Sequence, residues 1–152
     1  MKSNDFQDFL FKSAVMVMSC DGEIAQSEID ELENIISNEI YLLGYNHHEP
    51  LKSHIDEIRT NGKDAINKFL EELSRTDLSQ KQELILIEVL IKMIEADSII
   101  QPSEIKFFQL IKSKLKTSEE SLIIHFPKQV SFIIESNQYG FNQEFTDEIS
   151  LK

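Results

Sequence analysis

The chain has little of several residue types, and each shortage excludes a class of protein. It contains no Trp, one Cys, three Pro and four Gly in 152 residues. A single cysteine cannot form an intrachain disulfide, so we expect a reducing compartment, with the cytoplasm as the default location. Because Gly and Pro are scarce and no Asn-Gly turn separates alternating segments, the sequence favours helices over β-hairpins.

Basic residues are also few, with 15 Lys and Arg against 27 Asp and Glu, a formal charge of −12. Nucleic-acid binding needs a basic face that displaces counterions, so we expect no nucleic-acid partner. A cation or a protein with a basic face suits the charge better.

Long hydrophobic runs are absent as well. The longest, residues 84–94, contains Glu88 and Lys92 and is too short to span a bilayer. The first eight residues are polar and acidic, which is not typical of a signal peptide. We therefore expect a soluble protein with no membrane span.

Apolar residues that recur at helical spacing are plentiful and predict an all-α fold. With 41% hydrophobic residues and ten Phe, the chain can bury one core. We expect a single bundle of about six to eight helices over residues 1–136, followed by a polar, acidic tail over 137–152 that either docks on the bundle or is mobile. The expected helices are 6–18, 27–43, 51–61, 66–73, 80–96, 102–115, a short one from Ser118, and 130–134.

One short segment occurs twice. The pattern Asp-x-x-Ile-x-x-Ser-Glu-Ile begins at Asp21 and again at Asp97, each time after an apolar run and before an amphipathic one. Such a repeat predicts two similar helix–turn–helix corners related by a pseudo-twofold arrangement. We expect helices 6–18 and 84–94 to pack together centrally, with Ile24 and Ile100 buried in equivalent turns.

Four carboxylates of the repeat are the candidate metal ligands: Asp21, Glu28, Asp97 and Glu104. The first copy matches the latter half of an EF-hand loop, but its first half lacks ligands, so it is not an EF-hand. Two interpretations stay open. Either the two turns form a weak, shared oxygen site for Ca²⁺, Mg²⁺ or Mn²⁺, or the carboxylates only cap turns and complement helix dipoles.

The repeated segments, together with Lys116–Glu120, resemble the tellurite-resistance TerB family and the related helical domain of DjlA-type co-chaperones. The resemblance covers residues 6–126. It implies an all-helical bundle from bacterial stress-response systems that holds divalent metal at its acidic turns, with Asp21, Gly22, Glu28, Asp97 and Glu104 matching the family. Ser98 and Ile99 depart from its pattern, and the co-chaperone triplet His-Pro-Asp is missing.

Other reactive side chains give weaker indications. His47, His48 and His54 are not spaced to place two imidazoles on one helix face, so solvated loop histidines are expected rather than a transition-metal site. Cys20 has no basic neighbour and is expected to be structural. No phosphate-binding loop or hydrolase motif occurs, and we expect no enzymatic activity.

Acidic residues are in excess along the third, fourth and seventh expected helices, where we expect a basic-faced partner to bind: Asp56, Glu57, Asp64, Glu71, Glu72, Glu119 and Glu120. The aromatic residues of the tail (Tyr139, Phe141 and Phe145) are the alternative recognition element. The favoured function is a TerB-like module, metal-responsive or scaffolding, in stress response or defence. The alternative is an acidic immunity protein that masks a basic toxin.

Overall fold

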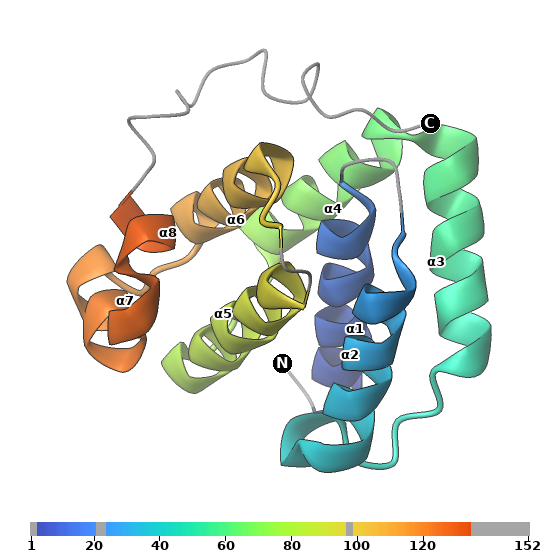
Figure 1. Ribbon diagram of the computed structural model, residues 1–152, viewed down its shortest axis with the longest axis horizontal. Helices are drawn as coiled ribbons and strands as arrows, with labels where there is room; N and C mark the ends of the chain where they lie inside the picture. The colour runs from blue at the N-terminus through green and yellow to red at the C-terminus, as the bar shows by residue number, and fades with distance from the viewer. Residues whose placement is uncertain (1–2, 21–23, 97–98, 135–152) are drawn as a thin grey trace.

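The computed structural model describes residues 3–20, 24–96 and 99–134 of the chain. Their regular secondary structure is entirely helical, with no strand among the described residues, as the sequence predicts (Figure 1). The helices are α1 (Ser3–Ser19), α2 (Gln26–Asn38), η1 (Ile40–Leu42), α3 (His48–Asn61), α4 (Lys63–Arg75), α5 (Gln80–Glu95), α6 (Pro102–Lys114), α7 (Glu119–His125), η2 (Pro127–Gln129) and α8 (Val130–Ile134).

Helices α1 and α5 form the centre of the bundle, and their mutual contact is the most extensive between any two elements. Both are apolar around most of their circumference, because other helices cover them on several sides. Phe11, Met16, Leu86 and Leu90 are fully buried. The prediction of two central helices is confirmed.

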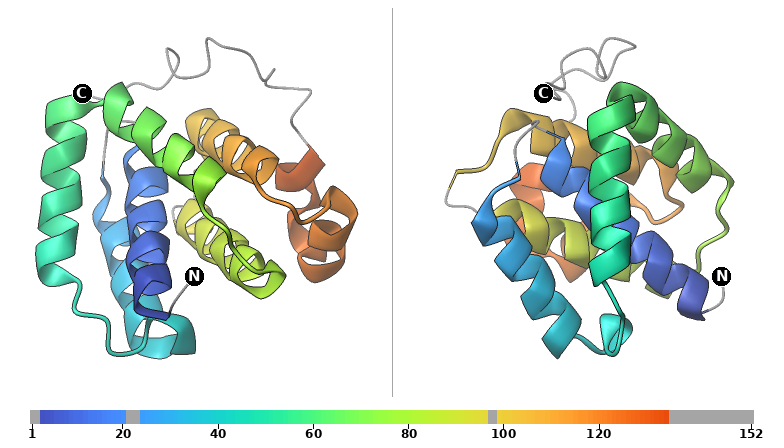
Figure 2. Two further views of the ribbon diagram at one scale, coloured as in Figure 1. Left: turned by 180° about the vertical axis from the view of Figure 1, so that it is seen from behind. Right: turned by 90° about the vertical axis from the view of Figure 1, so that its right-hand side faces the viewer.

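The two helix–turn–helix corners pack across one another. Helix α2 contacts α5, and α6 contacts α1, so the second helix of each corner lies on the first helix of the other. Figure 2 shows this crossing from behind and from the side. The crossed packing is compatible with a duplicated architecture, and the pseudo-twofold relation itself stays a prediction.

Helix α3 forms one end of the molecule and α7 and α8 form the other, while α4 runs from the end of α3 across the bundle to α6 (Figures 1 and 2). Gly62 joins α3 to α4 with a φ of 52°, a value that glycine adopts more easily than residues with a Cβ. Helix α3 packs on α1, while α4 packs on α6. Helix α3 therefore lies beside α1, at the far end of the molecule from α7 and α8 (Figure 1).

The helix predicted over residues 27–43 is wrong in its last turn. Helix α2 ends at Asn38, and Glu39 is extended, with φ −95° and ψ 131°. The break turns Glu39 toward Lys92 of α5, with which it forms an ion pair. It also lets the Tyr41 hydroxyl donate to Glu88 at 2.8 Å. Ile40, expected on the buried stripe, is instead 84% exposed.

The two isoleucines of the repeated turns are not equivalent, contrary to expectation. Ile24 is partly buried and packs against the core, but Ile100 is 40% exposed. Neighbouring Ile99 is 67% exposed, so the second turn presents apolar surface to solvent. The prediction that both isoleucines are buried is therefore wrong for Ile100.

Two further expectations concern the whole chain. Within the described ranges, no helix is both long and apolar enough to cross a membrane. The predicted tail over residues 137–152, with Tyr139, Phe141 and Phe145, lies outside the described residues.

Candidate functional site

The two glutamates of the repeated turns hold equivalent positions at the start of α2 and of α6. Glu28 is 4% exposed and accepts a hydrogen bond from the Ala25 backbone N–H at 3.1 Å. Glu104 is likewise 4% exposed and accepts from the Gln101 backbone N–H at 3.0 Å. Each carboxylate thus satisfies a backbone donor that a helix start would otherwise leave unpaired.

These contacts favour the capping interpretation of Glu28 and Glu104 without deciding the metal question. Asp21 and Asp97, the other half of the predicted ligand set, lie outside the described residues. Among the residues that are described, no group of three or more His, Cys, Asp or Glu side chains is arranged to hold a metal ion. The four-carboxylate site stays a prediction.

The histidines do not gather into one cluster. His47 and His48 lie together, with ring centroids 4.3 Å apart, and His47 is 3.4 Å from a Glu33 carboxylate oxygen. His54 lies on α3 against the Phe11 ring, at a centroid distance of 6.1 Å. Cys20, at the end of α1, is buried in the core.

The seven acidic residues predicted to meet a partner are exposed, except that Glu57 is half-buried. They do not form one surface, because α3 lies at the opposite end of the molecule from α7 and α4 runs between α3 and α6 (Figures 1 and 2). Two of them already have a cationic neighbour: Glu72 pairs with Lys12 at 3.4 Å, and Glu119 pairs with Lys112 at 2.8 Å. Five of the seven lie on the surface of α3 and α4, helices that also carry basic residues: Lys52, Arg59, Lys63, Lys68 and Arg75.

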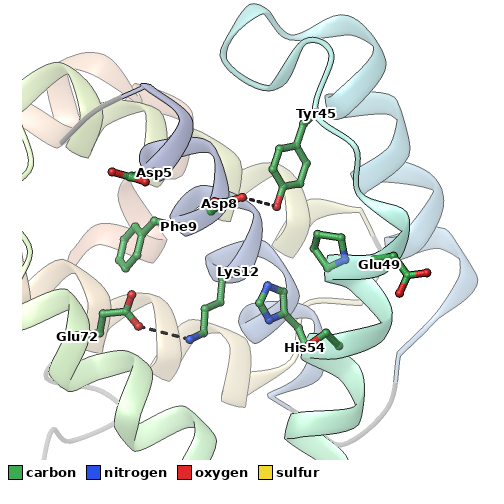
Figure 3. Close-up of a pocket in the computed structure, with 10 residues that line it drawn as sticks. Asp5, Asp8, Phe9, Lys12, Tyr45, Glu49, His54 and Glu72 are labelled. Carbon is green, nitrogen blue, oxygen red and sulfur yellow. Dashed lines mark hydrogen bonds and ion pairs between the residues drawn. The ribbon is translucent and has the colours of Figure 1, made fainter.

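A groove next to this surface combines acidic, aromatic and basic side chains (Figure 3). It lies between α1, α3 and α4 and is closed on one side by the segment that follows η1. Its volume is about 640 Å³. The lining residues are Asp5, Asp8, Phe9, Lys12, Tyr45, Glu49, Pro50, Ser53, His54 and Glu72.

The helical repeat of α1 brings its three charged groove residues to one side. Asp5, Asp8 and Lys12 are separated by three and four positions, so they follow one face of the helix. Phe9 also lines the groove and stacks on Phe69 of α4, with a centroid distance of 5.4 Å. The charged groups therefore stand on an apolar base.

Tyr45 forms the wall opposite Asp8. Its hydroxyl donates to Asp8 Oδ1 at 2.9 Å, and its ring lies 5.1 Å from that of Phe11. Burial raises the pKa of Tyr45, and the hydrogen bond to Asp8 raises it further. The hydroxyl consequently stays protonated and remains a hydrogen-bond donor at neutral pH.

His54 and Lys12 form the other end of the groove with Glu72. Burial lowers the pKa of His54, and the nearby Lys12 ammonium adds to this effect. The imidazole is therefore neutral at pH 7. Its Nδ1 is enclosed and has no hydrogen-bond partner among the described residues.

A second feature that the sequence did not reveal is the buried carboxylate of Glu83, which is 3% exposed. The Lys116 backbone N–H donates to both of its oxygens, at 3.1 and 3.0 Å. Thr117 adds its backbone N–H at 2.8 Å and its hydroxyl at 2.6 Å. Glu83 thus ties α5 to the segment between α6 and α7, which includes the start of the TerB-like Lys116–Glu120 stretch.

Comparison of the chain with protein-family models, with curated proteins and with solved structures gives no match. The resemblance to TerB therefore stays a prediction from the quoted motifs. The candidate site is defined by the geometry of the chain alone, as a groove lined by carboxylates, Lys12, Tyr45 and His54.

Proposed function

We propose that this chain is a non-enzymatic helical module whose acidic surface binds the basic face of a protein partner. The observation that carries the proposal is the juxtaposition of the acidic groove with the exposed carboxylates of α3 and α4. The groove lining alone contains four carboxylates against one lysine. Complementary charge of this kind speeds encounter and selects against wrong partners.

The biological setting of the proposal comes from the resemblance to TerB. It is bacterial stress response, including tellurite resistance, or defence, with the module acting as a scaffold. A weak divalent-cation site at Asp21, Glu28, Asp97 and Glu104 belongs to the same proposal and would make the module metal-responsive. The alternative is an immunity protein that masks a basic toxin, which requires the same kind of surface.

The proposal is tested by capturing partners from the source cells and reconstituting each complex from purified components. One variant reverses three exposed charges on α3 and α4: Asp56→Lys/Asp64→Lys/Glu71→Lys. A second variant reverses two charges on α7: Glu119→Lys/Glu120→Lys. We expect the first variant to lose the reconstituted complex and the second to retain it. A complex that survives reversal at α3 and α4 would contradict the proposal.

The identity of the reconstituted partner then distinguishes a scaffold in stress response or defence from an immunity protein. A component of a stress-response system supports the scaffold. A basic toxin, whose activity falls when one equivalent of the chain is added, supports the immunity protein.

A further inference from the structure

We infer that the exposed side chains of Ile40 and Leu43 anchor the protein partner by docking against an apolar patch that basic residues border. The inference rests on the proposed function and deepens it, because it names the residues at the centre of the contact and the surface that they fit. Three observations carry it: the exposure of the two side chains, the contacts that fix the residues between them, and the carboxylates nearby.

Ile40 and Leu43 form one apolar surface, which we call the η1 tip. Their side chains are 84% and 62% exposed. The Leu43 backbone N–H donates to the Ile40 carbonyl at 3.3 Å, and side chains three positions apart in a 3₁₀ turn lie above one another. Figure 1 shows η1 at the bottom of the view, beyond the ends of α1 and α2. Adjacent apolar side chains exposed within a polar border are typical of interaction sites.

The residues inside η1 are fixed to the rest of the fold, so the η1 tip is preorganised. Leu42 is fully buried, and the Tyr41 hydroxyl donates to Glu88 of α5 at 2.8 Å. Gln7 of α1 donates from Nε2 to the Tyr41 carbonyl at 3.2 Å. Because these contacts already order the backbone of η1, docking of the η1 tip loses little backbone entropy.

Carboxylates are in excess around η1. Burial raises the pKa of Tyr41, and the hydrogen bond to Glu88 and the charges of Glu88, Glu39 and Glu31 raise it further, so all three carboxylates lie near the middle of η1. Lys92 offsets one of them by pairing with Glu39. The remaining negative charge favours a partner patch bordered by Lys or Arg, and it repels a second copy of this chain or an anionic membrane.

The η1 tip also borders the acidic groove. The Tyr45 backbone N–H donates to the Leu42 carbonyl at 3.0 Å, and Tyr45 lines the groove with its hydroxyl bonded to Asp8. One partner can therefore cover both the groove and the η1 tip. Exposed charge at the rim of a contact mainly raises the association rate, whereas a buried apolar anchor mainly slows dissociation.

The experiment is a titration of the full-length chain, labelled with ¹⁵N, followed through its backbone amide chemical shifts. The probe is a helical peptide of leucine and lysine, patterned so that lysines border a stripe of leucines. One matched peptide replaces every leucine by glutamine, and another replaces every lysine by glutamate. We expect the leucine–lysine peptide to shift the amides of residues 39–46, and both matched peptides to bind there about tenfold more weakly or less.

Variants locate the contact. Ile40→Ser/Leu43→Ser removes the apolar surface of the η1 tip and should weaken binding of the leucine–lysine peptide by about tenfold. Ile124→Ser makes the same kind of change at a similarly exposed isoleucine of α7 and should change affinity by less than about twofold. Because all three side chains are exposed, both variants should fold normally, as circular dichroism would verify.

The reconstituted complex gives a second measurement. There, Ile40→Ser/Leu43→Ser should raise the dissociation rate constant by about tenfold and change the association rate constant by less than about twofold. Equal dissociation rate constants for this variant and the wild-type chain would contradict the inference.

Several results of the titration would also overturn it. One is a leucine–lysine peptide that shifts amides elsewhere but not those of residues 39–46, and another is an unchanged affinity in Ile40→Ser/Leu43→Ser. Equal binding of the glutamine or the glutamate peptide would show that charge alone or apolar surface alone suffices. Shifts of the same amides as the free chain is concentrated would assign the η1 tip to a second copy. Shifts caused by vesicles of phosphatidylcholine and phosphatidylglycerol would assign it to a membrane.

Failure of the proposed function is seen separately. The charge reversal on α3 and α4 leaves the η1 tip unchanged, so a reconstituted complex that tolerates this reversal contradicts the proposed function whatever the peptides show.

Discussion

At the scale of single residues, the polar groups that matter most are those that tertiary packing has enclosed. His54 and Glu83 illustrate two outcomes. The Glu83 carboxylate is surrounded by donors from one loop, so its burial is matched by hydrogen bonds. His54 has an enclosed nitrogen without a partner, so its charged form is disfavoured.

The lowered pKa of His54 makes stability depend on pH. In the unfolded chain the imidazole titrates near its ordinary value, whereas in the folded chain burial and Lys12 lower the pKa, against smaller opposing effects of Glu57, Asp8 and Glu72. Below the unfolded pKa, the unfolded state therefore binds more protons, and stability falls as pH decreases toward the folded pKa. Denaturant unfolding at several pH values should show this fall as the pH decreases through the ordinary pKa of histidine, about 6.5.

His54→Phe should flatten that part of the profile, because its ring does not titrate. The control is His48→Gln, which alters an exposed imidazole and should keep the slope of the wild-type chain. Parallel profiles for the wild-type chain and His54→Phe would show that His54 has the same pKa in both states.

The hydrogen bonds of Glu83 predict that a single substitution at this position strongly lowers the free energy of unfolding. Glu83→Ala should lower the free energy of unfolding by about 2–4 kcal/mol, because it leaves the backbone donors of Lys116 and Thr117 without their acceptor. Glu83→Gln keeps one carbonyl oxygen and should cost less. Thermal and denaturant unfolding measure both; a Glu83→Ala variant as stable as the wild-type chain would show that water replaces the carboxylate.

At the scale of elements, local signals predicted most helices. Ser79 and Ser118 cap α5 and α7 through their hydroxyls, as their residue types suggest, and Gly62 ends α3. The bend at Glu39 was missed because the partners of the residues that follow α2 are distant in the sequence: Glu39 pairs with Lys92 and Tyr41 with Glu88, both of α5. From the periodicity of apolar residues alone, the sequence predicted that α2 continues to Leu43 and that Ile40 lies on its buried face.

The acidic turns give the element-scale prediction. If Asp21, Glu28, Asp97 and Glu104 share a divalent cation, millimolar Ca²⁺, Mg²⁺ or Mn²⁺ should raise the melting temperature. The free energy of unfolding should rise by about 2.7 kcal/mol when the cation concentration is a hundredfold above its dissociation constant. Asp21→Asn should remove the gain. Melting curves that none of the three cations moves would leave Glu28 and Glu104 as helix caps only, where replacement by Ala costs about 1 kcal/mol each.

At the scale of the whole molecule, the groove was beyond prediction because its walls come from three helices and a loop. The charged positions of α1 were visible in the sequence, yet nothing local places Tyr45, His54 and Glu72 opposite them. The sequence did predict an acidic partner surface, but it grouped α7 with α3, and the fold places these two helices at opposite ends (Figure 1). Ile100 is exposed, contrary to prediction, because its burial would need tertiary packing that the repeat alone does not fix.

The central claim, recognition of a basic partner through charge, is tested most directly by the association rate constant of the reconstituted complex at increasing salt. Stopped-flow mixing gives this constant for the wild-type chain and for Asp56→Lys/Asp64→Lys/Glu71→Lys. For the wild-type chain, we predict a fall of about tenfold or more between about 50 and 500 mM salt, because counterions screen long-range attraction. A rate constant that stays within about twofold over that range would contradict charge-driven recognition and point to exposed apolar residues such as Ile40 and Leu43.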